Sequence, residues 1–169
     1  MKKIILIIIL VWGILIFVAS SQNWKESNEK SKRLIYPITK HVLKITNYWK
    51  ITNIDISNEK EINKIVNKLN YPIRKIAHIF LYFVLSILLM LVLTNCKLIP
   101  IKKMIIVVIL CFLYSITDEY HQTLISGRTG KITDCIIDTI GAVMGTTLFI
   151  QIEKINIAKK GEKKWRKEN

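Results

Sequence analysis

The chain has 169 residues, of which 51% are hydrophobic, and it carries a formal net charge of +14. High apolar content and a large basic excess rarely coexist in one soluble core, so together they indicate apolar membrane spans separated by basic loops. The basic residues do not alternate with aromatic residues on one face, and nucleic acid is therefore not an expected partner. The cysteines Cys96, Cys111 and Cys135 are odd in number and form no Cys-x-x-Cys motif, which argues against a disulfide framework or a zinc knuckle.

An uninterrupted apolar run covers residues 4–19. It predicts a first membrane-spanning helix, although it is short against the usual ~20 residues. A cleaved signal peptide is the alternative, because residues 18–20 would also serve as a small-residue cleavage site. Trp12 and Phe17 make the run bulky, and this favours a retained helix.

A polar, lysine-rich loop follows at residues 21–71 and contains two amphipathic stretches. The first, Leu34–Ile45, has apolar residues at near-helical spacing and is interrupted by Pro37. The second begins at Asn58, which forms a variant of the capping box with Glu61 three residues later. We expect short surface helices here, lying either over the ends of the spans or in the lipid headgroups.

Three further apolar segments are long enough to cross a membrane, and Pro72 is expected to begin the first of them because proline suits the first helical position. We predict a membrane domain over residues 1–152 and a basic cytoplasmic tail over residues 153–169. The predicted spans lie at about 4–19, 73–94, 101–120 and 132–152. The expected fold is an all-α integral membrane bundle of four transmembrane helices, with amphipathic helices in the first loop.

The distribution of lysines suggests an orientation in a cell membrane. The N-terminus, the turn at Lys97, Lys102 and Lys103, and the tail are all basic, and four spans place all three on the same side. The positive-inside rule makes that side cytoplasmic, so both termini are expected inside. The lysines of the first loop argue in the opposite direction.

Polar and ionisable residues gather at the ends of the last three spans, which this topology brings to one side of the membrane. Such residues are costly in a membrane unless paired, so a cluster of them predicts a functional site. Within the cluster, Asp118 faces His121 and Gln122 at helical spacing. The candidate ligand-binding or ion-pairing residues are Arg74, Lys75, His78, Tyr82, Asp118, Glu119, His121, Gln122, Arg128, Asp134 and Asp138.

Asp138 is the acid placed deepest in an apolar segment, ~9 Å into the fourth span at helical rise. It needs a partner or a proton, and Arg74 and Arg128 are the partners expected from their positions. Gly141 and Gly145 on the same face form a Gly-x-x-x-Gly pattern, which lets another helix approach closely.

These motifs together resemble the VanZ-like family of small bacterial integral membrane proteins. The family has Arg-Lys-x-x-His-x-x-x-Tyr opening one helix, Asp-Glu-x-x-Gln ending the next, then Gly-Arg-x-Gly, two aspartates and a glycine pair. The corresponding residues are Arg74, Lys75, His78, Tyr82, Asp118, Glu119, Gln122, Gly127, Arg128, Thr129, Gly130, Asp134, Asp138, Gly141 and Gly145. The Ser-Ser-Gln stretch at residues 20–22 is also similar to the family.

The sequence departs from the family pattern at two positions. Leu81 stands where an acid often precedes the tyrosine, and Ser126 stands where a proline often precedes Gly-Arg. The namesake of the family is linked to resistance against the glycopeptide antibiotic teicoplanin. The resemblance therefore implies action on the cell envelope at the outer surface.

Three readings of the cluster remain open. It could bind a polar or anionic envelope molecule, such as a lipid headgroup or a cell-wall precursor, because arginine in a glycine-rich loop suits phosphate or carboxylate. It could instead belong to a membrane-embedded metal-dependent hydrolase or transferase using His78, His121 and Asp118, although no His-Glu-x-x-His spacing supports a metal. Finally, it could be a structural ion-pair network. Membrane lipid is the expected partner, no cofactor is indicated, and no catalytic residue can be assigned.

Overall fold

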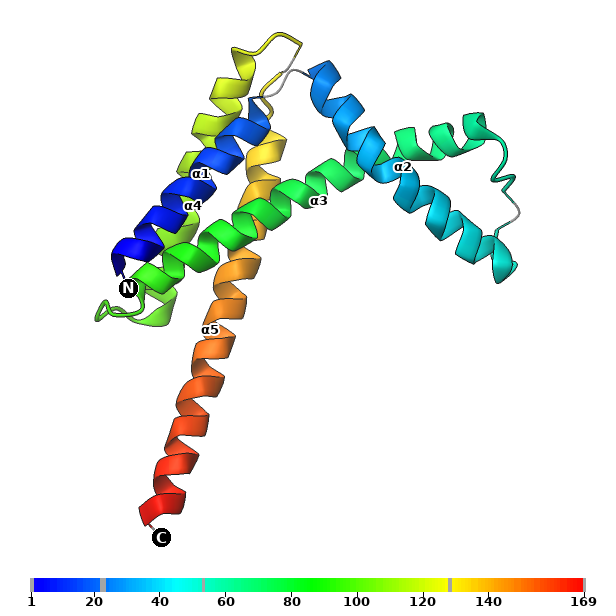
Figure 1. Ribbon diagram of the computed structural model, residues 1–169. Coiled ribbons are helices and arrows are strands. Elements are labelled where there is room, and N and C mark those ends of the chain that lie inside the picture. The colour runs from blue at the N-terminus through cyan, green and yellow to red at the C-terminus, as the bar shows by residue number, and fades with distance from the viewer. Residues whose placement is uncertain (1, 22–23, 53, 128, 169) are drawn as a thin grey trace.

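The computed structural model describes residues 2–21, 24–52, 54–127 and 129–168, and over these residues the chain forms five α-helices (Figure 1). Their order along the chain is α1 (Lys2–Ser20), α2 (Trp24–Tyr48), α3 (Glu59–Leu93), α4 (Pro100–Thr123) and α5 (Ile132–Glu168). All except α2 contain a stretch long and apolar enough to cross a membrane. The predicted all-α architecture with four membrane helices is therefore confirmed.

The four apolar helices pack into one bundle. Helix α3 contacts α1, α4 and α5, and α4 also contacts α1 and α5. The bundle core contains Ile16 of α1, Tyr82 and Met90 of α3, Val107 of α4 and Ala142 of α5. Each helix turns the rest of its apolar surface outward, as expected of helices that face lipid tails.

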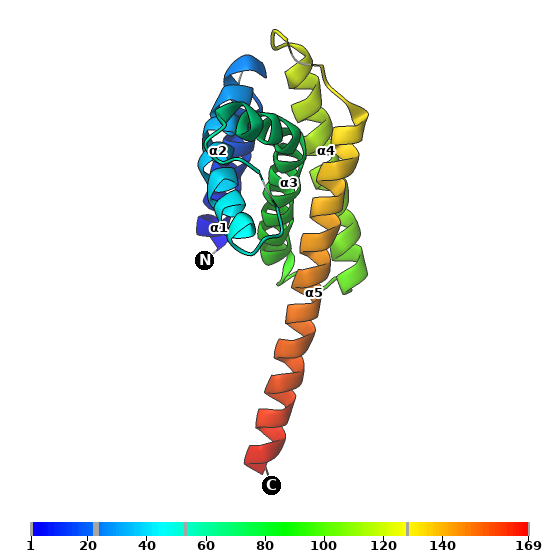
Figure 2. The same ribbon diagram turned by 90° about the vertical axis from the view of Figure 1, so that its right-hand side faces the viewer.

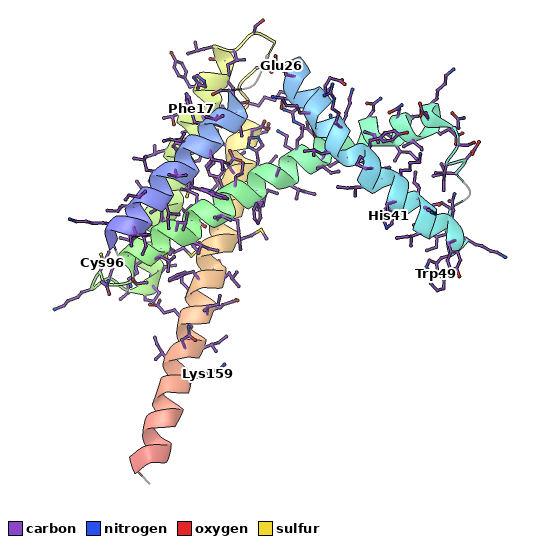
Figure 3. All side chains as sticks on the ribbon, in the orientation of Figure 1. Phe17, Glu26, His41, Trp49, Cys96 and Lys159 are labelled. Carbon is purple, nitrogen blue, oxygen red and sulfur yellow. The ribbon has the colours of Figure 1, made fainter. Side chains whose placement is uncertain are left out.

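The two termini lie at the same end of the bundle (Figures 1 and 2). At the opposite end, α1 and α4 stop and α5 begins, and we call this end the loop end because it carries the connection between α4 and α5. Phe17 lies toward the loop end and Cys96 at the terminal end (Figure 3). This arrangement brings together the polar ends of the spans, as the even number of spans predicts.

Helix α1 is held in the bundle by polar contacts as well as apolar ones. The indole of Trp12 donates to the carbonyl of Leu81 at 3.0 Å, and the hydroxyl of Tyr114 donates to the carbonyl of Gly13 at 2.7 Å. Hydrogen bonds are strong in a medium that offers no water as a competitor. These contacts join α1 to α3 and α4.

Helix α3 begins earlier than predicted. It is continuous from Glu59 to Leu93, and Pro72 lies inside it, so the expected helix start at Pro72 is wrong. The first turns are instead capped by Asn58, whose side-chain oxygen accepts from the backbone N–H of Lys60 at 3.1 Å. Proline removes only one backbone donor, and packing against α2 supports the helix before it.

Helix α2 and the first part of α3 form an arm beside the bundle (Figures 1 and 3). Its core consists of Ile35 and Leu43 of α2 with Ile62 and Val66 of α3. Helix α2 runs through Pro37 as a single element. The predicted surface helices therefore exist, but the second is the beginning of a membrane helix and the first packs along it.

Basic residues lie at the terminal end of α4 and along the end of α5. Lys103 is buried near the start of α4, and its ammonium donates to the carbonyl of Thr94 at the end of α3 at 3.3 Å. A cation is favourable at a helix C-terminus because of the helix dipole. Helix α5 continues past the predicted end of its span at residue 152, so most of the basic tail is helical.

Candidate functional site

The last two turns of α4 carry a buried polar face at the loop end. Asp118 accepts hydrogen bonds from the hydroxyl of Ser20 on α1 and from the amide of Gln122, the latter at 3.2 Å. The same amide donates to Glu119 at 3.2 Å, and the other oxygen of Glu119 accepts from the backbone N–H of Lys131 at 2.8 Å. This network joins α1, α4 and the connection that leads into α5.

The connection between α4 and α5 owes its path to glycines. Gly127 has a φ of 78°, a left-handed conformation that glycine adopts without strain. Gly130 lies so close to the carbonyl of Glu119 that any side chain there would collide with it. The Gly-Arg-x-Gly motif thus has a physical basis at both glycines. Arg128 between them lies outside the described residues.

Two contacts between a basic and an acidic residue join α3 to α5. The ammonium of Lys75 pairs with the carboxylate of Asp134, and both side chains are 18% exposed. One turn deeper, Nδ1 of His78 lies 3.4 Å from Oδ1 of Asp138. Asp138 is fully buried, and its other oxygen accepts from the hydroxyl of Ser115 on α4 at 2.5 Å.

Asp138 thus contacts His78 across the crossing of α3 and α5. Of the two arginine partners expected from the sequence, Arg128 lies outside the described residues, so that expectation stays a prediction. Further along α3, Tyr82 is fully buried, and its ring centre lies 6.2 Å from that of Tyr114. Tyr82 thus belongs to the bundle core below these contacts.

His121 points toward α1. Its Nε2 lies 3.2 Å from the hydroxyl of Ser21, and its ring centre lies 4.3 Å from that of Phe17. Among the described residues, no group of three or more His, Cys, Asp or Glu side chains is arranged to hold a metal ion. The metal-ligand set considered above, which needs His78, His121 and Asp118 together, has no geometric support there.

A cavity of about 240 Å³ opens between α3, the end of α4 and the start of α5. Its lining combines cationic side chains with polar ones: Tyr71, Arg74, Lys75, His78, Gln122, Gly127, Thr129, Lys131 and Asp134. Lys75 also lies 5.3 Å from the ring centre of Tyr71, a cation–π contact at the mouth. Lys75 and Asp134 neutralise each other, and Arg74 and Lys131 give the lining an excess of positive charge.

The structure thus sorts the predicted site residues by depth. Arg74, Lys75, His78, Gln122 and Asp134 line the cavity, whereas Asp118, Glu119 and Asp138 lie behind it and position its walls. His121 lies beside α1, and Tyr82 lies in the bundle core, so neither lines the cavity. All of these assignments to ligand binding remain predictions.

Sequence reasoning missed three contributors to the site. Ser115 holds Asp138, and Tyr71 and Lys131 line the cavity. Ser115 could have been found, because it precedes Asp118 by three residues and so shares its helical face. Tyr71 and Lys131 each adjoin a motif without belonging to it, and they carry no distinct signal.

The fold and the site define a multi-pass membrane protein in which the polar motifs at the ends of the spans meet at one end of a four-span bundle. A family model described as VanZ/LLP1 matches residues 4–154. The chain therefore belongs to this family, and the resemblance noted from its motifs is confirmed. Searches among curated proteins and among solved structures found no match.

Proposed function

We propose that the cavity binds the anionic group of a cell-envelope molecule, such as a lipid headgroup or a cell-wall precursor. The observation that carries this proposal is the composition of the cavity wall. Arg74, Lys75, His78 and Lys131 surround a space with one carboxylate, Asp134, which is paired internally. Positioned cationic donors in a partly dehydrated site are the usual means of holding phosphate or carboxylate.

Binding of a soluble anion tests this proposal. Titration of glycerol phosphate into the protein in nonionic detergent should give saturable binding that weakens as salt is added. Arg74→Gln should weaken the binding at least roughly tenfold, because a charge-assisted hydrogen bond contributes about 1.5–3 kcal/mol. Lys102→Gln is the matched control, since Lys102 is an exposed basic residue at the terminal end of the bundle. Equal binding by the two variants would contradict the proposal.

The proposed location of the cavity is the outer face of the cell membrane, with both termini cytoplasmic. The basis is the positive-inside rule applied to the terminal end of the bundle. In a background with Cys96→Ser, a membrane-impermeant thiol reagent added to intact cells should label Thr129→Cys and spare Lys97→Cys. Both positions are exposed on the protein, so the reverse pattern would place the cavity in the cytoplasm.

A link to glycopeptide resistance follows as a further part of the proposal. A site that binds an envelope component from outside acts in the compartment where teicoplanin meets the cell wall. Deletion of the protein should therefore change teicoplanin sensitivity and the envelope lipid profile, and Arg74→Gln should fail to restore either. Full restoration by Arg74→Gln would separate the phenotype from the cavity.

A purely structural role is the second candidate, and the Lys75–Asp134 pair is the observation that favours it. A charge pair between two helices can stabilise a bundle without binding anything. The double variant Lys75→Asp with Asp134→Lys exchanges the two charges and should be more stable than either single variant, whether or not the cavity binds a ligand. If the cavity binds an anion, the exchanged protein should also have a lower affinity for glycerol phosphate than the wild type, because the positive charge has moved to the other wall of the cavity.

A further inference from the structure

A large apolar groove lies in the corner between the end of α1, α2 and α3. It encloses about 680 Å³. Most of its wall is aliphatic, and the lining residues that matter below are Ala19, Lys30, Leu34, Ile38, Val42 and Arg74. The outward-facing residues of α2 in this wall are far from buried: Leu34 is 71% exposed and Ile38 is 64% exposed.

The groove has a polar end and an apolar end. Helices α2 and α3 cross in the arm (Figure 1), and a hydrogen bond between the side chains of Asn70 and Asn28 joins them near the bundle. Lys30 and Arg74 lie close in sequence to this pair, so they mark one end of the groove. Ile38 and Val42 lie farther along α2, toward the tip of the arm. A basic end followed by an apolar channel is the complement of an anionic amphiphile.

Arg74 connects the groove to the proposed binding site. Its side chain lines both the groove and the cationic cavity. A molecule whose anionic group occupied the cavity could therefore extend a hydrocarbon chain past Arg74 into the groove. Neither a free phosphate nor a soluble sugar phosphate would use the apolar part of this path.

A second copy of the chain is a poor occupant of the groove. The chain carries a net charge of +14, and the polar end of the groove is itself basic, so self-association there would bring like charges together. An anionic lipid would instead satisfy both the charge and the apolar surface.

We propose that the bound molecule is an anionic membrane phospholipid, with its phosphate in the cavity beside Arg74 and one acyl chain in the groove between α2 and α3. This inference rests on the proposed function and names the class of ligand. It assigns α2 a role in recognition, because the exposed apolar stripe of α2 (Leu34, Ile38 and Val42) forms the wall against which the acyl chain lies. The groove thereby distinguishes a lipid from a water-soluble anion that carries the same phosphate.

Two ligands with the same headgroup, one with acyl chains and one without, test the proposal. Dihexanoyl phosphatidylglycerol and its deacylated headgroup, glycerophosphoglycerol, are titrated into the protein in nonionic detergent, with dihexanoyl phosphatidylcholine as the zwitterionic control. Transfer of methylenes out of water is favourable, so we expect the acylated anion to bind at least roughly tenfold tighter than its headgroup. It should also bind tighter than phosphatidylcholine.

Substitutions of exposed apolar residues on α2 test where the acyl chain of the ligand lies. Ile38→Asn should remove the advantage of the acylated ligand and leave headgroup binding unchanged. Ile45→Asn is the control, because Ile45 is 47% exposed on the same stripe but lies outside the groove lining. Both side chains are exposed, so both variants should keep wild-type helicity and melting temperature, which circular dichroism checks.

The results separate this inference from the proposed function. If the headgroup binds as well as the lipid, or if Ile38→Asn and Ile45→Asn behave alike, the groove assignment is wrong while the anion site stands. If phosphatidylcholine binds as tightly as phosphatidylglycerol, the groove holds bulk lipid and the inference fails. If neither anionic ligand binds, the proposed function fails with it.

Discussion

Helices α3 and α5 meet in two different ways along a single crossing. Toward the loop end they are joined by side-chain contacts, an ion pair of Lys75 with Asp134 and a contact of His78 with Asp138. Farther toward the terminal end they are joined by close backbone approach, where glycines of α5 contact the backbone of α3.

The close contact leaves no room for a side chain. A Cβ atom at Gly141 would collide with the backbone of Ile79, and one at Gly145 would collide with the backbone of Phe83 and the hydroxyl of Ser86. Backbone atoms cannot move aside as a flexible side chain can. The glycine contact therefore fixes the distance between the two helices, whereas the side-chain contacts occupy a region wide enough to open into a cavity.

The largest effect is expected from filling the glycine contact. Gly141→Leu should lower the free energy of unfolding by about 3 kcal/mol or more, the upper range for overpacking, because the two helix axes must separate. Thermal unfolding in detergent measures the change. Gly13→Ala is a control for adding a Cβ at a helical glycine, since a Cβ there would meet Tyr114 at ordinary contact distances, 3.7 Å from its hydroxyl oxygen and 4.0 Å from the ring carbon that carries it. Equal melting temperatures for the two variants would show that the close crossing does not hold the bundle.

An intermediate effect is expected from the buried contact of Asp138 with His78. Asp138→Asn should lower the free energy of unfolding by roughly 2 kcal/mol, because the hydrogen bond from Ser115 and the contact with His78 are disturbed inside the bundle. Combining it with His78→Gln should recover part of the loss, and a double-mutant cycle would give a coupling of about 1 kcal/mol or more. Strict additivity would mean that the two side chains do not interact.

The smallest effect on stability is expected from the outer pair, which borders the cavity. Lys75→Gln should lower the free energy of unfolding by about 1 kcal/mol or less, as for pairs that water still reaches. Its effect on binding of glycerol phosphate should be larger, at least roughly fivefold, because the cavity loses a cation. A large loss of stability with unchanged binding would instead mark Lys75 as a structural residue.

Those features that follow from periodicity and composition could be predicted from the sequence. The four spans, the pairing of Asp118 with Gln122 and the closeness of the helices at Gly141 all follow from helical spacing and residue size. These are local properties of one helix or of one surface. Contacts between helices are not local properties, and the sequence therefore predicted which residues gather at the site better than it predicted their partners on other helices.

The errors came from interactions between helices. Pro72 was taken as a helix start because its own sequence neighbourhood allows one, but packing of Val66 against α2 carries the helix through it. For Asp138, charge suggested an arginine partner, and nothing in the sequence indicated the contact with His78 that the structure shows. Ser115 was overlooked because a serine in an apolar helix has no charge to draw attention to it.

The continuity of α3 has a mechanical consequence. At ~1.5 Å per residue, its 35 residues measure roughly 52 Å, which exceeds the ~30 Å of a hydrocarbon core. The arm and one wall of the cavity are consequently parts of the same rod, with Pro72 at the junction. Lys75 and His78, which line the cavity, therefore stand on the same helix as the arm, within two turns of Pro72.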